Sequence, residues 1–422
     1  MNELKCAALF AVGFFLGQTV SFAVESGTSQ AVMPLHDFSA WVPVERTTEK
    51  IVLVDECVMK SETDSWQLKF YRNRAYKCGL SGNYTFVIVE PRNNPGGEAP
   101  LWVYYHGGGS GYFDREGEYI TLKFQNKDTY NHEESFETLS KINSGNPVFK
   151  DGRFVGGDNT LTRRVKEGYR LLVVGYGDHD TYSGTGNPYH NNPEGGEVNG
   201  LQACMAAVEY TVANYPTTHV FAHGTSAGSA GVYALGFAFA REGINLTGVV
   251  MDSLIITPRA TPVFMAMAAN ESKIIPEETW GILKRESENG WLGWPRGMIE
   301  KVGMMSNPEY PFYPEAAVRA GYDSVPMLII AGKNDRFYGA EAPLIPEAKA
   351  SGLSNVEWMF DGLRQAIDER KNSPHQLLVV NAGHVPTAKM DDHPIHDEVD
   401  AFICKARNFR PTYPFVNKGD DR

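Results

Sequence analysis

Short apolar runs bounded by turn residues recur along the chain and predict buried strands. Valine, isoleucine and leucine dominate these runs, which are too short for helices. From Arg170 onward the runs alternate with segments of helical apolar spacing, as in a parallel sheet covered by helices on both faces. The sequence therefore predicts an α/β fold. The expected strands are Ile51–Val54, Thr85–Val89, Leu101–Tyr105, Arg170–Val174, His219–Ala222, Gly248–Ile256, Met327–Ala331 and Gln376–Val380, and the expected helices are Glu197–Asn214, Ser226–Arg241 and Pro394–Arg407.

Two stretches interrupt this alternation. Residues 112–158 are polar and rich in Asn, Glu and Lys, whereas residues 258–323 carry Met and Trp at quasi-helical spacing. That spacing is more typical of the core of a helical subdomain than of a ligand surface. Both roles are compatible in a helical lid whose inner face forms an apolar wall for a substrate. We expect residues 24–422 to form one domain with these two insertions.

The N-terminus predicts export. Lys5 precedes an apolar run from Cys6 to Val20, and Ser21 and Ala23 are the small residues of a signal-peptide cleavage site. A membrane anchor is the alternative, but glycines interrupt the run and it is too short to span a bilayer comfortably. We therefore expect residues 1–23 to be a signal peptide, the protein to be secreted or periplasmic, and the mature chain to have no membrane span.

Four cysteines remain after the signal peptide. In an oxidising compartment they can pair in three ways. Cys57 and Cys78 flank an antiparallel-looking segment, Trp66–Tyr71, and are the pair we expect to form a disulfide. Cys204 and Cys404 lie in apolar helical patterns and are expected to be buried thiols. Cys-x-x-Cys and matching histidine spacings do not occur, so no metal site is predicted.

Charge narrows the possible partners. The chain has 51 acidic and 39 basic residues, for a formal charge of −12, and 42% of its residues are hydrophobic. This composition is that of a folded protein. A nucleic-acid or anionic-lipid binder needs a basic face, so neither is expected as a partner. Strongly anionic polymers are disfavoured for the same reason, and neutral or acetylated substrates fit better.

A glycine-flanked serine carries the candidate chemistry. Gly224-Thr-Ser226-Ala-Gly228 follows the predicted strand His219–Ala222 and opens a predicted helix. A sharp, strained turn at this point presents the serine hydroxyl at the carboxyl edge of the sheet, and a side chain at either glycine would clash with neighbouring backbone. Ser226 is the predicted nucleophile.

A run of glycines follows the strand Leu101–Tyr105. In His106-Gly107-Gly108-Gly109-Ser-Gly, we expect the amides of Gly107 and Gly108 to form an oxyanion hole with the amide of Ala227. A phosphate-binding loop is the competing interpretation, but neither a following Lys-Ser/Thr nor Gly-x-Gly-x-x-Gly is present. His106 is expected to hold the loop through its ring nitrogens.

Two further residues complete a triad in the chain order Ser, Asp, His. Asp335 follows the strand Met327–Ala331, and His384 follows the strand Gln376–Val380. The carboxyl ends of parallel strands meet at one edge of the sheet, which brings these loops to Ser226. His384 would be the general base, and Asp335 would fix its tautomer and stabilise its cation.

Other acidic and histidine residues compete for these roles. Asp252, at the end of the strand before the lid, is an alternative acid. His393 and His396 are interpreted as solvated or capping residues, and His223 as packed beneath the elbow. The cluster 178–180 (Asp-His-Asp) has weak metal-ligand geometry and is better explained as a hydrogen-bonded loop or a pocket lining.

These motifs resemble the α/β-hydrolase superfamily, in its branch of serine esterases with a His-Gly-Gly-Gly loop, across residues 80–410. The resemblance implies a mostly parallel, eight-stranded sheet and the roles given above. A narrower similarity is to pectin acetylesterases and Notum-like carboxylesterases, through Gly177-Asp-His179, Asn199-Gly and Met251-Asp-Ser. Where that family usually has an aromatic residue and a cysteine after the glycines, this chain has Ser110-Gly-Tyr112.

The sequence thus predicts a cofactor-independent serine esterase acting on short-chain or acetyl esters of small molecules or polymers. A serine peptidase of the prolyl-peptidase type uses the same triad order, but only about eighty residues precede the core, which is too few for a propeller. A binding module on a hydrolase scaffold is the non-enzymatic alternative.

Overall fold

The computed structural model describes residues 44–78, 81–108, 111–113, 119–121, 132–142, 147–156, 159–177, 179–180, 182, 184–188, 195–241, 243–253, 257, 259, 314–319, 321, 325–335, 346–388 and 395–409. Most of the lid-like segment 258–323 lies outside these residues, as do parts of the insertion 112–158. The expected signal peptide, residues 1–23, lies wholly outside them. Within the described part of the chain, no helix is both long enough and apolar enough to cross a bilayer.

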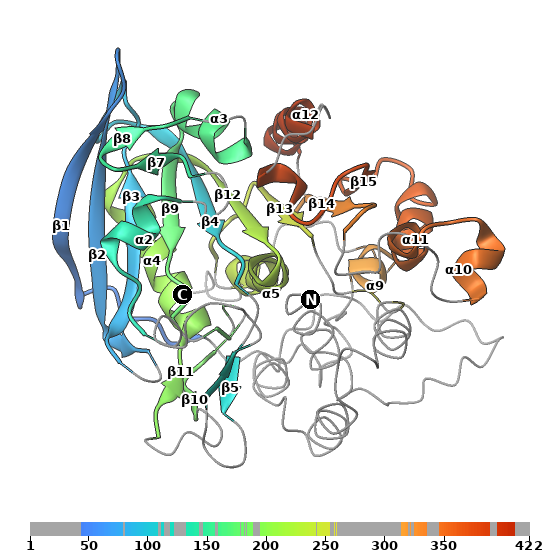
Figure 1. Cartoon of the computed structure of the whole chain (residues 1–422), viewed down its shortest axis with the longest axis horizontal. Helices are drawn as coiled ribbons and strands as arrows, with labels where there is room; N and C mark the ends of the chain where they lie inside the picture. Colours follow the sequence, from blue (N-terminus) through green and yellow to red (C-terminus); the bar gives the residue numbers. More distant parts are fainter. Residues whose placement is uncertain are drawn as a thin grey trace, which may run out of the picture.

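A mixed, mostly parallel sheet forms the centre of the molecule (Figure 1). Six strands run parallel in the order β15-β14-β13-β12-β4-β9, and β3, β2 and β1 continue the sheet in antiparallel fashion. In spatial order the strands are β15 (Gln376–Val380), β14 (Met327–Gly332), β13 (Gly248–Asp252), β12 (Thr217–Thr225), β4 (Ala99–Tyr105), β9 (Arg170–Val174), β3 (Asn83–Val89), β2 (Ser65–Lys77), β1 (Ile51–Lys60), β8 (Arg153–Phe154) and β7 (Phe149–Lys150). The α/β fold class is confirmed. The resemblance implies eight strands, whereas the sheet has eleven within the described residues, because β2, β7 and β8 join the eight strands that the sequence predicts.

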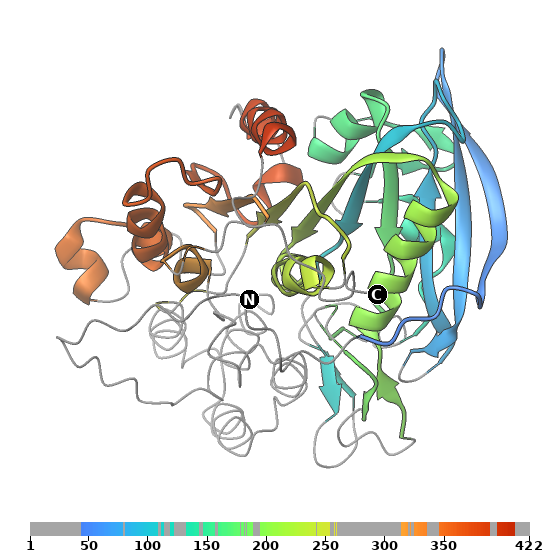
Figure 2. The ribbon, with the colours of Figure 1, turned by 180° about the vertical axis from the view of Figure 1, so that it is seen from behind.

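Helices cover both faces of the sheet (Figures 1 and 2). Alternate strand residues divide into two cores: Val103 and Ala222 face one, and Trp102 and Phe221 face the other. This alternation follows from the two-residue period of a strand, and because both faces are covered, nearly every central strand position is apolar. The first core is closed by α4 (Gly200–Asn214), α5 (Ala227–Arg241), α9 (Pro314–Arg319) and α11 (Asn355–Asp368), and the second by α2 (Phe136–Ser140), α3 (Thr160–Lys166) and α12 (Ile395–Asn408).

Each of the eight predicted strands and three predicted helices is present. The sequence interpretation did not include helix α11. Ser354 caps this helix through a capping box with Glu357. Short elements complete the described chain: α10 (Pro346–Ser351), the 3₁₀ helix η3 (Pro386–Ala388), and the two-stranded pairs β5 (Gly111–Phe113) with β6 (Tyr119–Thr121) and β10 (Asn187–Pro188) with β11 (Glu197–Val198).

The expected disulfide between Cys57 and Cys78 does not form. Cys57 lies opposite Leu68 in the β1–β2 pair, whereas Cys78 follows the far end of β2. Ten residues of strand separate Leu68 from Cys78, or roughly 30 Å, while the Cα atoms of a disulfide lie within about 7 Å of each other. Cys204 is a buried thiol in α4 as expected, but Cys404 is exposed on α12.

Candidate active site

Ser226 occupies a strained turn between β12 and α5. Its backbone has φ +53°, in the left-handed region that residues with a side chain seldom adopt. A Cβ at Gly224 would overlap the carbonyl of Gly228, and a Cβ at Gly228 would overlap the carbonyl of Tyr105. Both glycines are therefore required for the sharp turn that the sequence predicts. Ser226 is partly exposed, whereas the residues on either side of it are buried.

The loops after β14 and β15 bring an acid and a base together. His384 Nδ1 lies 2.7 Å from Asp335 Oδ2. The Asp335 side chain is fully buried, while that of His384 is 20% exposed. A buried carboxylate beside Nδ1 favours the tautomer with the proton on Nδ1, and in that tautomer Nε2 carries no proton and can act as a base. The two loops can approach because Gly332, at the end of β14, lies directly against the carbonyl of Gly383.

The glycine loop after β4 lies against the nucleophile. A Cβ at Gly107 would lie 2.8 Å from Ser226 Cβ and 2.7 Å from the Thr225 carbonyl oxygen, so this position must be glycine. The amide of Gly107, however, donates to Thr225 Oγ1 at 3.0 Å. That hydrogen bond corrects one expectation: the Gly107 amide holds the loop onto β12, and the predicted oxyanion donors are reduced to Gly108 and Ala227.

His106 anchors the same loop, as the sequence predicts. Its Nε2 lies 3.0 Å from Glu134 Oε2, and its Nδ1 lies 2.9 Å from the Gly107 carbonyl oxygen. Glu134 Oε2 also accepts from the Tyr176 amide at 2.6 Å, which ties the insertion 112–158 to the loop after β9. The sequence interpretation missed Glu134, because the residue belongs to no motif and reaches His106 only through the tertiary fold.

Two of the rival histidines, His223 and His396, are buried among other elements. His223 is 1% exposed beneath the elbow, and its ring lies edge-on to that of Trp102. Burial, with a smaller contribution from Arg164, lowers the pKa of His223 to about 3. His396 is 2% exposed, which corrects the expectation of a solvated or capping residue. His393 lies outside the described residues.

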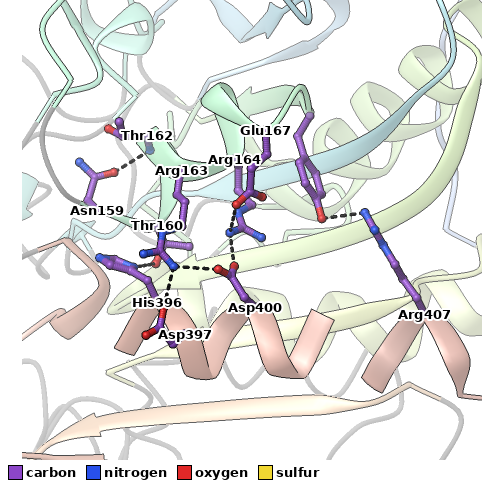
Figure 3. Close-up of polar contacts among 11 residues, drawn as sticks. Asn159, Thr160, Thr162, Arg163, Arg164, Glu167, His396, Asp397, Asp400 and Arg407 are labelled. Atoms are coloured by element: carbon purple, nitrogen blue, oxygen red, sulfur yellow. Dashed lines mark hydrogen bonds and ion pairs between the residues drawn. The ribbon is translucent and has the colours of Figure 1, made fainter. Parts of the chain in front are cut away.

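Figure 3 shows what surrounds His396. Its Nδ1 lies 3.0 Å from Thr160 Oγ1, at the start of α3. On the same two helices, Arg163 donates to Asp397 and Asp400, and Arg164 forms an ion pair with Asp400. These contacts join α3 to α12. His396 therefore belongs to a helix-packing network rather than to the candidate active site.

The rival acids accept hydrogen bonds from other groups. Asp180 accepts three backbone N–H groups, from Tyr182 at 2.9 Å, Gly184 at 2.7 Å and Gly200 at 2.9 Å. It thus organises a loop and the start of α4, as the hydrogen-bonded-loop alternative predicted. His179 beside it stacks on Tyr176 with ring centroids 4.5 Å apart, and Asp178 lies outside the described residues. Asp252 accepts hydrogen bonds from Thr387 and Ser253.

No protein family model and no curated protein matches this chain. It is similar to the solved structure of an S-formylglutathione hydrolase from Agrobacterium tumefaciens, with 11% identity and a TM-score of 0.42, over 83% of this chain and 98% of that chain. Est1E from Butyrivibrio proteoclasticus shares 15% identity with a TM-score of 0.35, over 84% and 99% of the two chains. A fungal esterase from Rhizomucor miehei shares 11% identity with a TM-score of 0.34, over 96% of each. With identities of 11–15% and TM-scores of 0.34–0.42, these similarities do not show which reaction, if any, this chain carries out.

Proposed function

We propose that this protein is a serine hydrolase of the α/β-hydrolase superfamily that cleaves carboxylic esters through an acyl-enzyme. The observation that carries the proposal is the 2.7 Å contact between His384 and Asp335 at the sheet edge where Ser226 occupies its strained turn. Gly107, in van der Waals reach of the nucleophile, supports the same conclusion. Nucleophile, base and acid follow β12, β15 and β14, as acyl transfer on such a sheet requires.

In the proposed mechanism, His384 Nε2 removes the proton of Ser226 as the hydroxyl attacks the ester carbonyl. The tetrahedral oxyanion receives hydrogen bonds from the amides of Gly108 and Ala227. His384 then gives the proton to the departing alcohol, which leaves Ser226 acylated. A water molecule, activated by the same histidine, attacks the acyl carbonyl and releases the acid. No cofactor or metal takes part in these steps.

The test is hydrolysis of p-nitrophenyl esters, from acetate to palmitate, by the chain from Val24 onward. Ser226→Ala is expected to abolish turnover and fluorophosphonate labelling while the melting temperature changes by only about a few degrees, because an exposed hydroxyl contributes little packing. Ser351→Ala, on the distant helix α10, is the matched control and should keep both activities.

The chain-length profile identifies the substrate class. Turnover confined to short acyl chains would support esters of acetyl or other small acyl groups, including acetylated polymers, whereas turnover that grows with chain length would indicate a lipase. Hydrolysis of peptide amides alone would favour the peptidase alternative. Ester hydrolysis that persists in Ser226→Ala would refute the assigned nucleophile, and a chain that turns over neither substrate class would favour a binding module.

A further inference from the structure

Asp252 is a fully buried carboxylate at this sheet edge that the proposed mechanism does not use. It is the last residue of β13, and neither it nor the adjacent Ser253 has any exposed surface. Its strand lies between β12, which leads to the nucleophile, and β14, which leads to Asp335. The position is therefore central to the site, although His384 bonds to Asp335 instead.

The Asp252 carboxylate holds the loop that carries the catalytic histidine, residues 381–388, here called the histidine loop. Its Oδ2 accepts from the Thr387 amide at 2.9 Å and from the Thr387 hydroxyl. Its Oδ1 accepts from Ser253 Oγ at 3.2 Å, and Ser253 Oγ in turn accepts from the Val385 amide at 2.8 Å. The backbone is thus fixed one residue and three residues after His384.

The same residue is also bonded to the nucleophile turn. The Ser226 amide donates to the Asp252 carbonyl oxygen at 2.9 Å. Asp252 therefore contacts the base-bearing loop through its side chain and the nucleophile through its backbone. A group in this position sets the relative placement of the two reacting residues.

The backbone at these contacts is strained, so the tether has a physical task. Val385 has φ +56° and Ser253 has φ +60°. A positive φ is a marked outlier for a β-branched residue, and such strain persists only where surrounding contacts over-determine the backbone. The hydrogen bond from the Val385 amide to Ser253 supplies that constraint directly beside His384.

We propose that Asp252, acting through Ser253 and Thr387, is a positioning residue that holds the histidine loop and so places His384 between Asp335 and Ser226. This inference rests on the proposed function. His223 supports the arrangement from below, because its Nε2 lies 3.4 Å from Thr387 Oγ1, whose own hydrogen is donated to Asp252. Burial raises the pKa of Asp252 to about 6, while hydrogen bonds from Thr387 and the charge of the nearby His384 favour its ionised form.

The experiment compares kcat and KM on the best p-nitrophenyl ester for three variants that each weaken the tether: Asp252→Asn, Ser253→Ala and Thr387→Val. Each is expected to lower kcat about 10- to 100-fold with KM within about threefold of wild type, because the base is displaced while substrate contacts remain. Rates are divided by the concentration of sites that a fluorophosphonate titrates, so loss of folded protein does not count as loss of rate.

Two controls separate positioning from general packing. Thr387→Ser keeps the hydroxyl and should restore a rate close to wild type, whereas the isosteric Thr387→Val should not. Glu90→Gln alters a different buried carboxylate, which contacts Arg170 and Lys69, and should lower the melting temperature without changing kcat.

Three outcomes would overturn the inference. Wild-type kcat in Ser253→Ala and Thr387→Val would show that the tether does not position the base. A loss in Asp252→Asn as large as that expected for a triad acid, with activity retained in Asp335→Asn, would make Asp252 the acid. Absence of Ser226-dependent turnover in the wild-type chain would overturn the proposed function as well, so the two failures are distinguishable.

Discussion

Replacing His223 with glutamine should remove part of the acid sensitivity of the fold. His223 is buried beneath the elbow, and its pKa is lowered from 6.5 to about 3, mainly by burial and further by the charge of Arg164. The native state therefore holds the imidazole neutral, while the unfolded chain protonates it below 6.5. Between about pH 6.5 and pH 3 the unfolded state binds more protons, so the free energy of unfolding falls as the pH falls through this window.

The magnitude follows from the two pKa values. At about pH 4 the unfolded imidazole is almost fully protonated and the native one only about one-tenth, which costs the wild type about 3 kcal/mol relative to about pH 7. Glutamine has no such titration, and its amide can still donate to Thr387 Oγ1. Asp252, whose pKa is raised, has the opposite effect: its native form takes up a proton below about 6, which favours folding on acidification. That contribution is common to both proteins and largely cancels in their difference.

The assay is urea denaturation followed by tryptophan fluorescence at several pH values from about 7 to about 4. His223→Gln will start from a lower stability, because the ring packing against Trp102 and Tyr104 is lost. The test is the pH dependence of the free energy of unfolding, which should fall by about 3 kcal/mol more in the wild type than in the variant between about pH 7 and about pH 4. Parallel curves, within about 1 kcal/mol of each other, would refute a neutral, buried imidazole at this position.

Three further predictions concern the site and its scaffold. Asp335→Asn should lower kcat about 10⁴-fold, because an amide beside Nδ1 favours the wrong tautomer of His384; steady-state kinetics will measure this, and a loss under about tenfold would contradict it. Glu134→Ala should release His106 and the glycine loop and lower kcat about 10- to 100-fold with little change in KM; a rise in KM alone would show that the loop binds substrate rather than the oxyanion. Glu90→Ala leaves the buried Arg170 guanidinium without its carboxylate. Urea denaturation should show a free energy of unfolding lower by about 3 kcal/mol, with kcat unchanged. Unchanged stability would mean that the hydrogen bonds from Arg170 to the Gly97 and Pro216 carbonyls are enough to stabilise its charge.

The elements that carry the site could be predicted because their signals are local. Each central strand is buried on both faces, so its sequence is a continuous apolar run. The elbow needs Gly224 and Gly228 for steric reasons, and both lie within two positions of Ser226 in the sequence, so the motif is visible locally. Asp335 and His384 follow their strands directly, so the parallel order alone brought them to one edge.

What the sequence did not reveal depends on contacts between distant segments. Glu134 meets His106 only because the insertion folds back onto the loop after β9. The disulfide prediction was wrong because proximity along the chain was taken for proximity in space, whereas the β1–β2 hairpin is long and carries Cys57 and Cys78 to opposite ends. The Gly107 amide was misassigned for a similar reason, since its partner hydroxyl on Thr225 is supplied by another strand.

Backbone strain is an independent indication of where the proposed chemistry takes place. Among the described residues, eight other than glycine have a positive φ, and five of these follow a parallel strand of the sheet: Ser226 after β12, Ser253 after β13, Val385 after β15, and His179 and Tyr182 after β9. Strain of this kind persists only where surrounding contacts over-determine the backbone, and it gathers at functional sites. Here the contacts are buried hydrogen bonds that backbone amides donate: the Thr387 amide of the histidine loop to Asp252, and the Tyr182 amide of the loop after β9 to Asp180. The strained backbone of the carboxyl edge is therefore stabilised by hydrogen bonds to two buried carboxylates, which is the arrangement that the proposed positioning role of Asp252 requires.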